Sequence, residues 1–87
     1  MDATHNTTPL LLTIDEAAAF ETVRRLCRNI DPIVRKNAVR ALVHFERRGA
    51  AREVLDEALE DSDPEVRAVA EWTRDTIRAA KMYELFG

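Results

Sequence analysis

The sequence of 87 residues has little of the material from which several classes of protein are built. Its single cysteine, Cys27, excludes an intramolecular disulfide and is typical of a reducing compartment. Its two glycines, Gly49 and Gly87, are too few for a glycine-rich phosphate-binding loop. No segment approaches the roughly 20 apolar residues of a membrane helix, and no basic residue precedes the short apolar run 10–12 as it would in a secretory signal. We therefore expect a cytoplasmic protein with no membrane association.

Side chains for catalysis or metal binding are equally scarce. Neither histidine, His5 or His44, has a cysteine or carboxylate at a metal-ligand spacing such as His-Glu-x-x-His. A cluster of acidic residues falls mostly on a predicted helix instead of a calcium-binding loop, so we expect a solvated face. Its members are Asp56, Glu57, Glu60, Asp61 and Asp63. The sequence predicts a protein that is not an enzyme and holds no metal and no cofactor.

Length and composition predict one small globular domain. Hydrophobic residues make up 46% of the chain and charged residues 33%. A chain of this length buries only somewhat more than about 60% of its unfolded surface and seldom supports a second core. We expect residues 1–12 to form a flexible tail ending in an apolar arm, Leu10–Leu12, and residues 13–87 to form the domain.

Charge is distributed unevenly along the chain. Residues 1–48 carry eight basic against six acidic residues, whereas residues 49–87 carry five against ten, and the net charge is −3. This asymmetry could steer head-to-tail association or an acidic partner toward the first half, although salt screens such effects beyond about 8 Å. We expect a solvated charged surface in preference to either. A nucleic-acid-binding module that uses the basic first half is an alternative function. The isoelectric point near 5.3 argues against it.

The most specific pattern is a five-residue segment that occurs twice. The segment Asp31–Arg35, Asp-Pro-Ile-Val-Arg, returns 32 residues later as Asp63–Arg67, Asp-Pro-Glu-Val-Arg. Each copy continues to an alanine at the same place, Ala38 or Ala70. A fixed period of this length indicates one supersecondary unit used twice, whose copies bury their apolar faces by stacking. The pattern predicts a repeat protein that holds a partner.

The repeated segments predict the starts of two helices. Asp31 and Asp63 each precede a proline, as expected when aspartate is the N-cap and proline takes the first helical position. The second of these helices is expected to run without a break from Pro64 to Leu85, longer than its counterpart.

Two further helices are predicted from other boundary signals. The spacing within Thr13–Glu16 is that of a capping box, so a helix is expected from there to about Arg28. Gly49 is expected to end the helix that starts at Pro32 as a left-handed C-cap, and a short helix is expected over Ala50–Glu60. The result is four helices in two antiparallel hairpins.

Apolar residues repeat at the same offset of 32 residues, which predicts the core. The matching pairs are Ala19/Ala51, Val23/Leu55, Leu26/Ala58, Cys27/Leu59, Val34/Val66, Ala38/Ala70 and Phe45/Ile77. Because Cys27 matches a leucine, we interpret it as a small core residue and not a nucleophile. The match weakens where Thr73 and Arg74 stand in place of Ala41 and Leu42. The polar Arg74 at an inward position suggests that the stack ends at this repeat.

The repeated pattern resembles the HEAT-like repeats, in particular the short variety of phycobilin-lyase-type proteins, over about residues 15–80. The resemblance implies that Asp31 and Asp63 cap their helices, and that Arg35 and Arg67 form a ladder of hydrogen bonds with those aspartates or with neighbouring loop carbonyls. With Pro32 and Pro64, these residues would be structural. The chain departs from the family in having two repeats, where about three or more are usually needed for stability. The long last helix, the apolar arm or self-association would supply the stability that a third repeat usually provides.

Two stripes of residues differ between the repeats and are the candidate partner-binding surface. In HEAT-like stacks the second helices line the concave side. The helix after Pro32 carries the basic stripe Lys36, Arg40, His44 and Arg47, at spacings of four, four and three. The last helix carries the equivalent positions Ala68, Trp72, Thr76 and Ala79, followed by Tyr83 and Phe86. Together the stripes predict a grip for an acidic, amphipathic segment of another protein, with Trp72 as the apolar anchor.

Three alternatives remain open for what covers the aromatic residues of the last helix, Trp72, Tyr83 and Phe86. A partner protein could cover them, the same surface of a second copy could cover them in a homodimer, or the chain's own Leu10–Leu12 arm could lie over them. We expect a non-catalytic protein-interaction or scaffold module. An accessory subunit that stabilises a larger enzyme is a special case of the same function.

Overall fold

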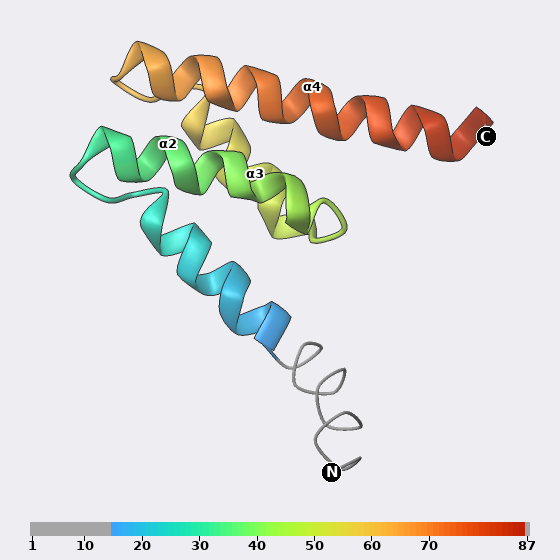
Figure 1. Ribbon diagram of the computed structural model, residues 1–87, viewed down its shortest axis with the longest axis horizontal. Coiled ribbons are helices and arrows are strands. Elements are labelled where there is room, and N and C mark those ends of the chain that lie inside the picture. The colour runs from blue at the N-terminus through green and yellow to red at the C-terminus, as the bar shows by residue number, and fades with distance from the viewer. Residues whose placement is uncertain (1–14, 87) are drawn as a thin grey trace, which may run out of the picture.

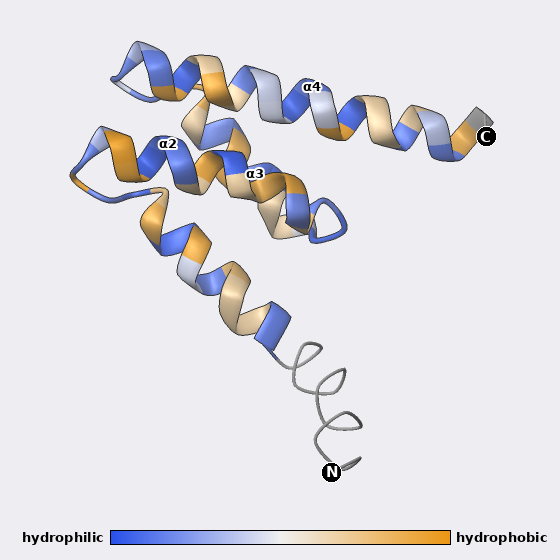
Figure 2. Ribbon diagram, viewed as in Figure 1, coloured by the Kyte–Doolittle hydropathy of each residue, from blue (hydrophilic) through white to orange (hydrophobic). Residues whose placement is uncertain are grey.

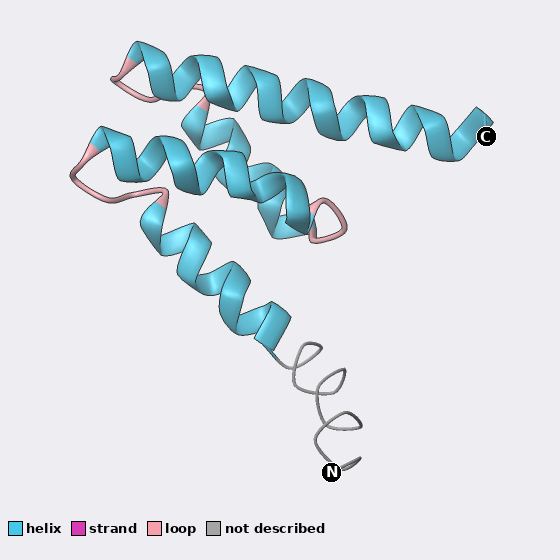
Figure 3. Cartoon of the chain, viewed as in Figure 1, coloured by secondary structure: helices cyan, strands magenta, loops and turns pink. Residues whose placement is uncertain are grey.

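The computed structural model describes residues 15–86, which fold into helices joined by short connections, with no strand in that range (Figures 1 and 3). The first helix covers residues 15–26. It is followed by α2 (Pro32–Ala41), the 3-10 helix η1 (Leu42–Phe45), α3 (Gly49–Ala58) and α4 (Pro64–Phe86). The predicted all-α stack of two hairpins is confirmed. The tail and apolar arm predicted over residues 1–12, and Thr13 of the predicted capping box, lie outside the described residues.

The two hairpins stack side by side, so that α4 packs against both α2 and α3. In Figure 1, α2 and α4 point the same way along the long axis, and α4 runs on past the ends of the other labelled helices. The molecule measures 49 × 38 × 18 Å, and its short dimension is close to two helix diameters. Its radius of gyration is 15.0 Å, whereas about 12 Å is expected for a compact domain of this length. The shape is that of a short, flat stack.

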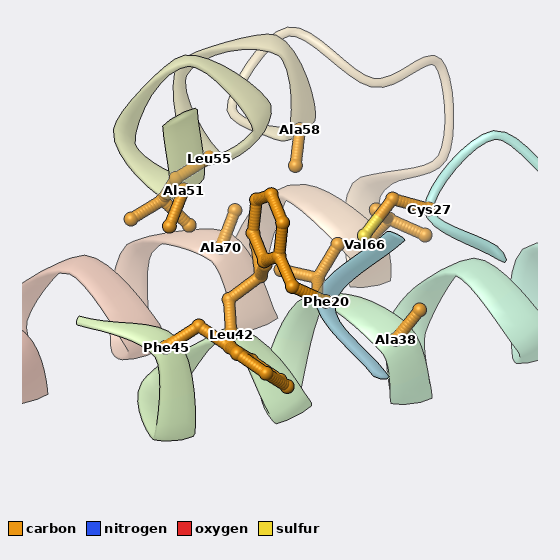
Figure 4. Close-up of a cluster of buried hydrophobic side chains, with 11 residues drawn as sticks. Phe20, Cys27, Ala38, Leu42, Phe45, Ala51, Leu55, Ala58, Val66 and Ala70 are labelled. Atoms are coloured by element: carbon orange, nitrogen blue, oxygen red, sulfur yellow. The ribbon is translucent and has the colours of Figure 1, made fainter. Parts of the chain in front are cut away.

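The core lies where the four helices meet (Figure 4). Val39 and Leu42 from the α2 side and Val66 from α4 are completely buried. The first helix contributes Phe20, whose ring centroid lies 5.5 Å from that of Phe45 at an interplanar angle of 57°. Such tilted aromatic pairs add stabilisation beyond the apolar area that they bury. Small buried residues allow the helices to pack closely; they are Ala38, Ala51, Ala58 and Ala70.

The predicted inward pairs are correct for α3 and only partly correct for the first helix. Ala19 and Leu26 are exposed, although their partners in α3 are buried. The first helix buries Phe20, which was not predicted, together with Cys27, which was, and Val23 is partly buried between them. The helix is rotated about its axis by about one residue relative to α3. In the described part of the chain nothing packs on its outer side, so only one stripe needs to be apolar.

The end of the second helix differs from the prediction. The α-helix stops at Ala41 and tightens into η1, and the chain then turns through residues 46–48. Gly49 is the first residue of α3 and has no positive φ, so its predicted role as a left-handed C-cap is wrong. A 3-10 turn satisfies the last carbonyls of a helix without a left-handed residue, which removes the need for glycine. Arg48 precedes α3 in an extended conformation, with φ −90° and ψ 123°.

Other boundaries shift by one or two residues. The first helix ends at residue 26, two residues before the prediction, and α3 covers Gly49–Ala58 where Ala50–Glu60 was predicted. The last helix matches its prediction within one residue. The two helices that begin with Asp-Pro are thus the ones whose starts were predicted correctly.

Candidate functional site

Each copy of the repeated segment begins with an aspartate that caps a helix. Asp31 Oδ1 accepts a hydrogen bond of 2.9 Å from the Ile33 amide. Asp63 Oδ1 accepts from the amides of Glu65 and Val66 at 2.8 and 3.2 Å. The proline after each aspartate takes the first helical position, where no amide proton is required. The predicted capping function is confirmed in both repeats.

The arginine of the first copy joins the two repeats. Arg35 Nε donates to Asp61 Oδ2 at 2.9 Å and Arg35 Nη2 donates to Asp61 Oδ1 at 3.0 Å, which makes a bidentate ion pair. Its Nη1 also donates to the carbonyls of Asn29 and Ile30 at 2.8 and 3.0 Å. The two side chains are only 15% and 12% exposed. Charge-assisted pairs of this geometry are stronger than ordinary hydrogen bonds, so Arg35 holds the loop before α2 to the loop before α4.

The pKa values of the pair follow from this geometry. Burial alone would raise the pKa of Asp61, but the hydrogen bonds from Arg35 and from the Asp63 amide hold that pKa below its ordinary value. The hydrogen bond to Asp61 raises the pKa of Arg35. Both groups are therefore charged at neutral pH.

The arginine of the second copy repeats half of this arrangement. Arg67 Nη1 donates to the Asp61 carbonyl at 2.6 Å, just as Arg35 donates to the carbonyl of Asn29, 32 residues earlier. The ladder through loop carbonyls is as predicted, but its carboxylate is Asp61 and not either capping aspartate. Those aspartates turn toward the amides of their own helices. No carboxylate within the described residues forms an ion pair with Arg67.

Two acidic residues predicted to lie on a solvated face form ion pairs. Asp61 is largely buried in the pair with Arg35, which the prediction missed, whereas Glu57 stays exposed and accepts two hydrogen bonds from Arg28 at 2.9 and 3.0 Å. The signal for Asp61 is present in the repeat, because Asn29 stands at the matching position. The side chains of both residues accept from the amide two residues later, at 2.9 Å in each repeat.

Cys27 is a core residue, as predicted. It is 9% exposed and belongs to the buried apolar cluster. Burial, and secondarily the nearby Glu57 carboxylate, raises the pKa of its thiol to about 11. The thiolate that a nucleophile requires is therefore disfavoured at neutral pH.

The second helices of the two repeats, α2 and α4, have adjacent flanks that form one surface. We call it the second-helix surface. Lys36 Nζ lies 3.4 Å from Glu65 Oε1, which places these two flanks next to each other. The buried Thr73 hydroxyl donates to the Val39 carbonyl at 3.4 Å, so the middle of α4 contacts the last turn of α2. Thr73 is thus an inward residue of the stack and not part of its outer face. Trp72, beside it in the sequence, is 52% exposed.

The structure places most of the predicted partner-binding residues on this second-helix surface. Trp72 and Thr76 follow Glu65 by seven and eleven residues, and Tyr83, 80% exposed, follows by eighteen, so all three share the flank of Glu65. Arg40 and His44 are exposed one and two turns after Lys36. The side chain of Phe86 and the Leu10–Leu12 arm lie outside the described part of the structure.

Arg47 does not belong to this surface. It lies in the turn after η1 and lines a cleft on the opposite flank of α4. The predicted stripe assumed a continuous α-helix from Lys36 to Arg47, and the 3-10 segment breaks that spacing.

The cleft that Arg47 lines was not predicted from the sequence. It has a volume of about 410 Å³ and is formed by the α2–α3 turn, α3 and the middle of α4. We call it the basic cleft; its lining residues include Arg47, Arg48, Arg52, Arg74, Arg78 and Lys81. Leu55 and Ile77 supply apolar surface, and the acidic residues are Glu46 and Asp56. The averaged charge of the second half concealed this cluster, because only Asp56 of its ten acidic residues lines the cleft.

Within residues 15–86 no three histidine, cysteine or carboxylate side chains gather as metal ligands would. Likewise, none of the helices in that range is both long and apolar enough to cross a membrane.

The geometry of the repeats agrees with a comparison to protein families. No curated protein and no solved structure matches the chain. The family model of HEAT repeats matches residues 8–73, which include both copies of the Asp-Pro-x-Val-Arg segment and the ion pair between them. The chain therefore belongs to the family of HEAT repeats.

Proposed function

We propose that this protein is a non-catalytic interaction module that binds a partner protein on its second-helix surface. Repeats of this family generally mediate protein–protein interaction. The observation that carries the proposal for this chain is the exposure of Trp72: the only tryptophan has half of its surface in water. Exposed aromatic residues at the centre of a surface are the usual anchors of protein interfaces.

The surroundings of Trp72 fit an amphipathic segment of a partner. Tyr83 extends the apolar surface along α4, and Thr76 lies between the two aromatic residues. On the α2 side, the exposed Arg40 and His44 provide positive charge and hydrogen-bond donors for acidic residues at the rim. Lys36 is already engaged by Glu65 and contributes less.

Two further details of the proposal concern its location in the cell and self-association. The buried thiol of Cys27 is suited to a reducing compartment, which supports a cytoplasmic location. The aromatic surface is also suited to a second copy of the chain, and a homodimer through Trp72 is the outcome to be separated from binding of a different protein.

Affinity capture with matched variants tests the proposal. Tagged wild type, Trp72→Ala and Ile30→Ala are each used to recover proteins from native lysate, and the recovered proteins are identified by mass spectrometry. Ile30 is 94% exposed, so its variant also removes an exposed apolar side chain, but from the loop before α2. We expect a partner that Ile30→Ala retains and Trp72→Ala loses. Identical recoveries with both variants would contradict the proposed surface.

Sedimentation of the purified chain separates the homodimer from a different partner. If Trp72 binds a different protein, wild type stays monomeric at micromolar concentration. A dimer that Trp72→Ala converts to monomer would assign this surface to self-association instead.

A further inference from the structure

The structure points to a second binding surface, and we infer that the basic cleft receives an acidic amphipathic helix of a partner protein. The inference goes beyond the proposed function, because the cleft lies on the flank of α4 that faces away from Trp72. Arg74 stands two residues after Trp72, and side chains at that spacing point to different faces of a helix.

Charge is the first argument. Six basic residues line the cleft against two acidic ones, although the whole chain has a net charge of −3. Four of the basic side chains are exposed and form no ion pair within the described residues; they are Arg47, Arg52, Arg78 and Lys81. Arg74 pairs only with its neighbour Asp75 at 3.2 Å, and Arg48 approaches Glu16 at 3.7 Å. The cleft thus presents positive charge on four side chains that no carboxylate of residues 15–86 pairs with.

The apolar floor is the second argument. Ile77 of α4, which is partly buried, and Leu55 of α3, which is 6% exposed at the edge of the core, line the cleft together with these cations. An acidic segment with apolar residues on one side would place them on this floor and its carboxylates on the surrounding arginines. A duplex nucleic acid would pair with the cations but leave the apolar floor unused.

The position of the cleft in the stack indicates that the occupant is a helix. The cleft lies where α3, the α2–α3 turn and the flank of α4 opposite Trp72 meet, and no residue of α2 itself lines it. A further hairpin of the stack would pack against this part of the second repeat. Arg67 lies on that same flank of α4, seven residues before Arg74, and no carboxylate of the described residues pairs with it. An acidic residue of the occupant would meet Arg67 as Asp61 meets Arg35 in the first repeat.

A second copy of the chain fits less well than a different protein. Continuing the stack would bring the first half of another copy against the cleft, and that half carries eight basic against six acidic residues. It also has Asn29 where the ladder would require an aspartate. Like charge opposes this contact, whereas an acidic helix is attracted to it.

Binding of a designed peptide tests the inference. The probe is a fluorescein-labelled helical peptide with leucines along one face and glutamates on the flanks, and fluorescence anisotropy gives its dissociation constant. The scrambled control has the same composition but no apolar face. We expect the probe to bind the full chain more tightly than the scrambled peptide does. Equal binding of the two, or tighter binding of a duplex DNA, would overturn the inference.

Charge-reversal variants locate the binding. The double variant Arg78→Glu/Lys81→Glu reverses two cations of the cleft, and we expect at least about a tenfold loss of affinity. The matched control Arg24→Glu/Arg25→Glu makes the same change in net charge on the first helix, where both residues are exposed, and should change affinity less than about twofold. Circular dichroism establishes that both variants are folded. Equal losses in both would overturn the inference.

Nuclear magnetic resonance separates this surface from the proposed one. On titration of the labelled chain with the probe, the amide signals of Arg52 and Ile77 should shift while the Trp72 indole signal stays in place. Shifts confined to Trp72 and its neighbours would overturn the basic cleft and leave the proposed function standing. A dimer of the free chain that Arg78→Glu/Lys81→Glu dissociates would replace the partner helix with a second copy.

Discussion

The difference between the matching residues Asn29 and Asp61 reflects the direction in which the two repeats stack. Asn29 and Asp61 occupy the same place in their loops, and each accepts from the amide two residues later. Only Asp61 also receives the guanidinium of Arg35 from the repeat before it, and only Asp61 is charged. The carboxylate stands where the arginine of the preceding repeat needs an acceptor. The pair links α2 to the loop before α4, and the two residues are 26 positions apart in the chain.

We expect Asp61→Asn to destabilise the fold strongly. The variant keeps an oxygen for the Asp63 amide but leaves the largely buried Arg35 without its counter-charge. The melting temperature should fall by roughly 5 to 10 °C. The control is Glu57→Gln, which removes the exposed pair with Arg28 and should lower the melting temperature by no more than about 2 °C. Equal effects of the two variants would show that Asp61 has no special role.

The same pair makes stability depend on pH. The pKa of Asp61 is lower in the folded protein than in the unfolded chain, so its contribution is present above the unfolded pKa and is lost as the pH falls through the folded value. In wild type, the free energy of unfolding should fall below about pH 4 more steeply than in Asp61→Asn. Urea titrations across this range measure the difference, and parallel curves would argue against it.

The thiol of Cys27 provides a second test at this scale. Its pKa is raised from 9.0 to about 11, so its reaction with a disulfide reagent at pH 8 should be roughly a hundredfold slower than in urea-unfolded protein. Because the pKa is higher in the folded state, the Cys27 contribution to stability is lost as the pH rises from 9.0 toward about 11. A thiol that reacts equally fast in both states would contradict its burial.

At the scale of elements, local signals of different strength explain which helices were predicted well. Asp-Pro fixes a helix start through two independent requirements, a capping oxygen and a position without an amide proton, and both such starts were predicted correctly. Gly49 carried only one signal, and the 3-10 ending of the second helix made it unnecessary. The rotation of the first helix, which buries Phe20 and exposes Ala19, depends on having a neighbour on one side only.

Replacement of Gly49 by alanine should therefore stabilise the protein. The residue is helical with no positive φ, and a Cβ atom built there would meet nothing within 4 Å. Alanine restricts the unfolded chain more than glycine, so the free energy of unfolding should rise by about 0.5 kcal/mol in urea titrations. The reverse change next to it, Ala50→Gly, should lower the free energy by a similar amount. If Gly49→Ala instead lowered the free energy of unfolding, the result would favour the earlier prediction that Gly49 is a left-handed C-cap.

At the scale of the whole molecule, the second helices keep the shared residues Ala38 and Ala70 inside the stack and expose Trp72 and its counterpart Arg40. Trp72 and the basic cleft lie on different flanks of α4, the helix that packs on both α2 and α3 (Figure 2 shows polar and apolar residues alternating along it). The sequence predicted the first surface because its residues recur at helical spacing. It could not predict the second, since the cleft gathers residues from three segments whose proximity depends on the packing angle between α3 and α4.

The emission of Trp72 in dilute monomer tests the central claim most directly. The protein has one tryptophan, so its fluorescence reports this site alone. We expect the spectrum of a water-exposed indole, efficient quenching by acrylamide, no change with protein concentration, and a blue shift when the captured partner is added. An indole that is already blue-shifted and protected in the dilute monomer would show that the chain covers Trp72 itself, and would contradict the proposed binding surface.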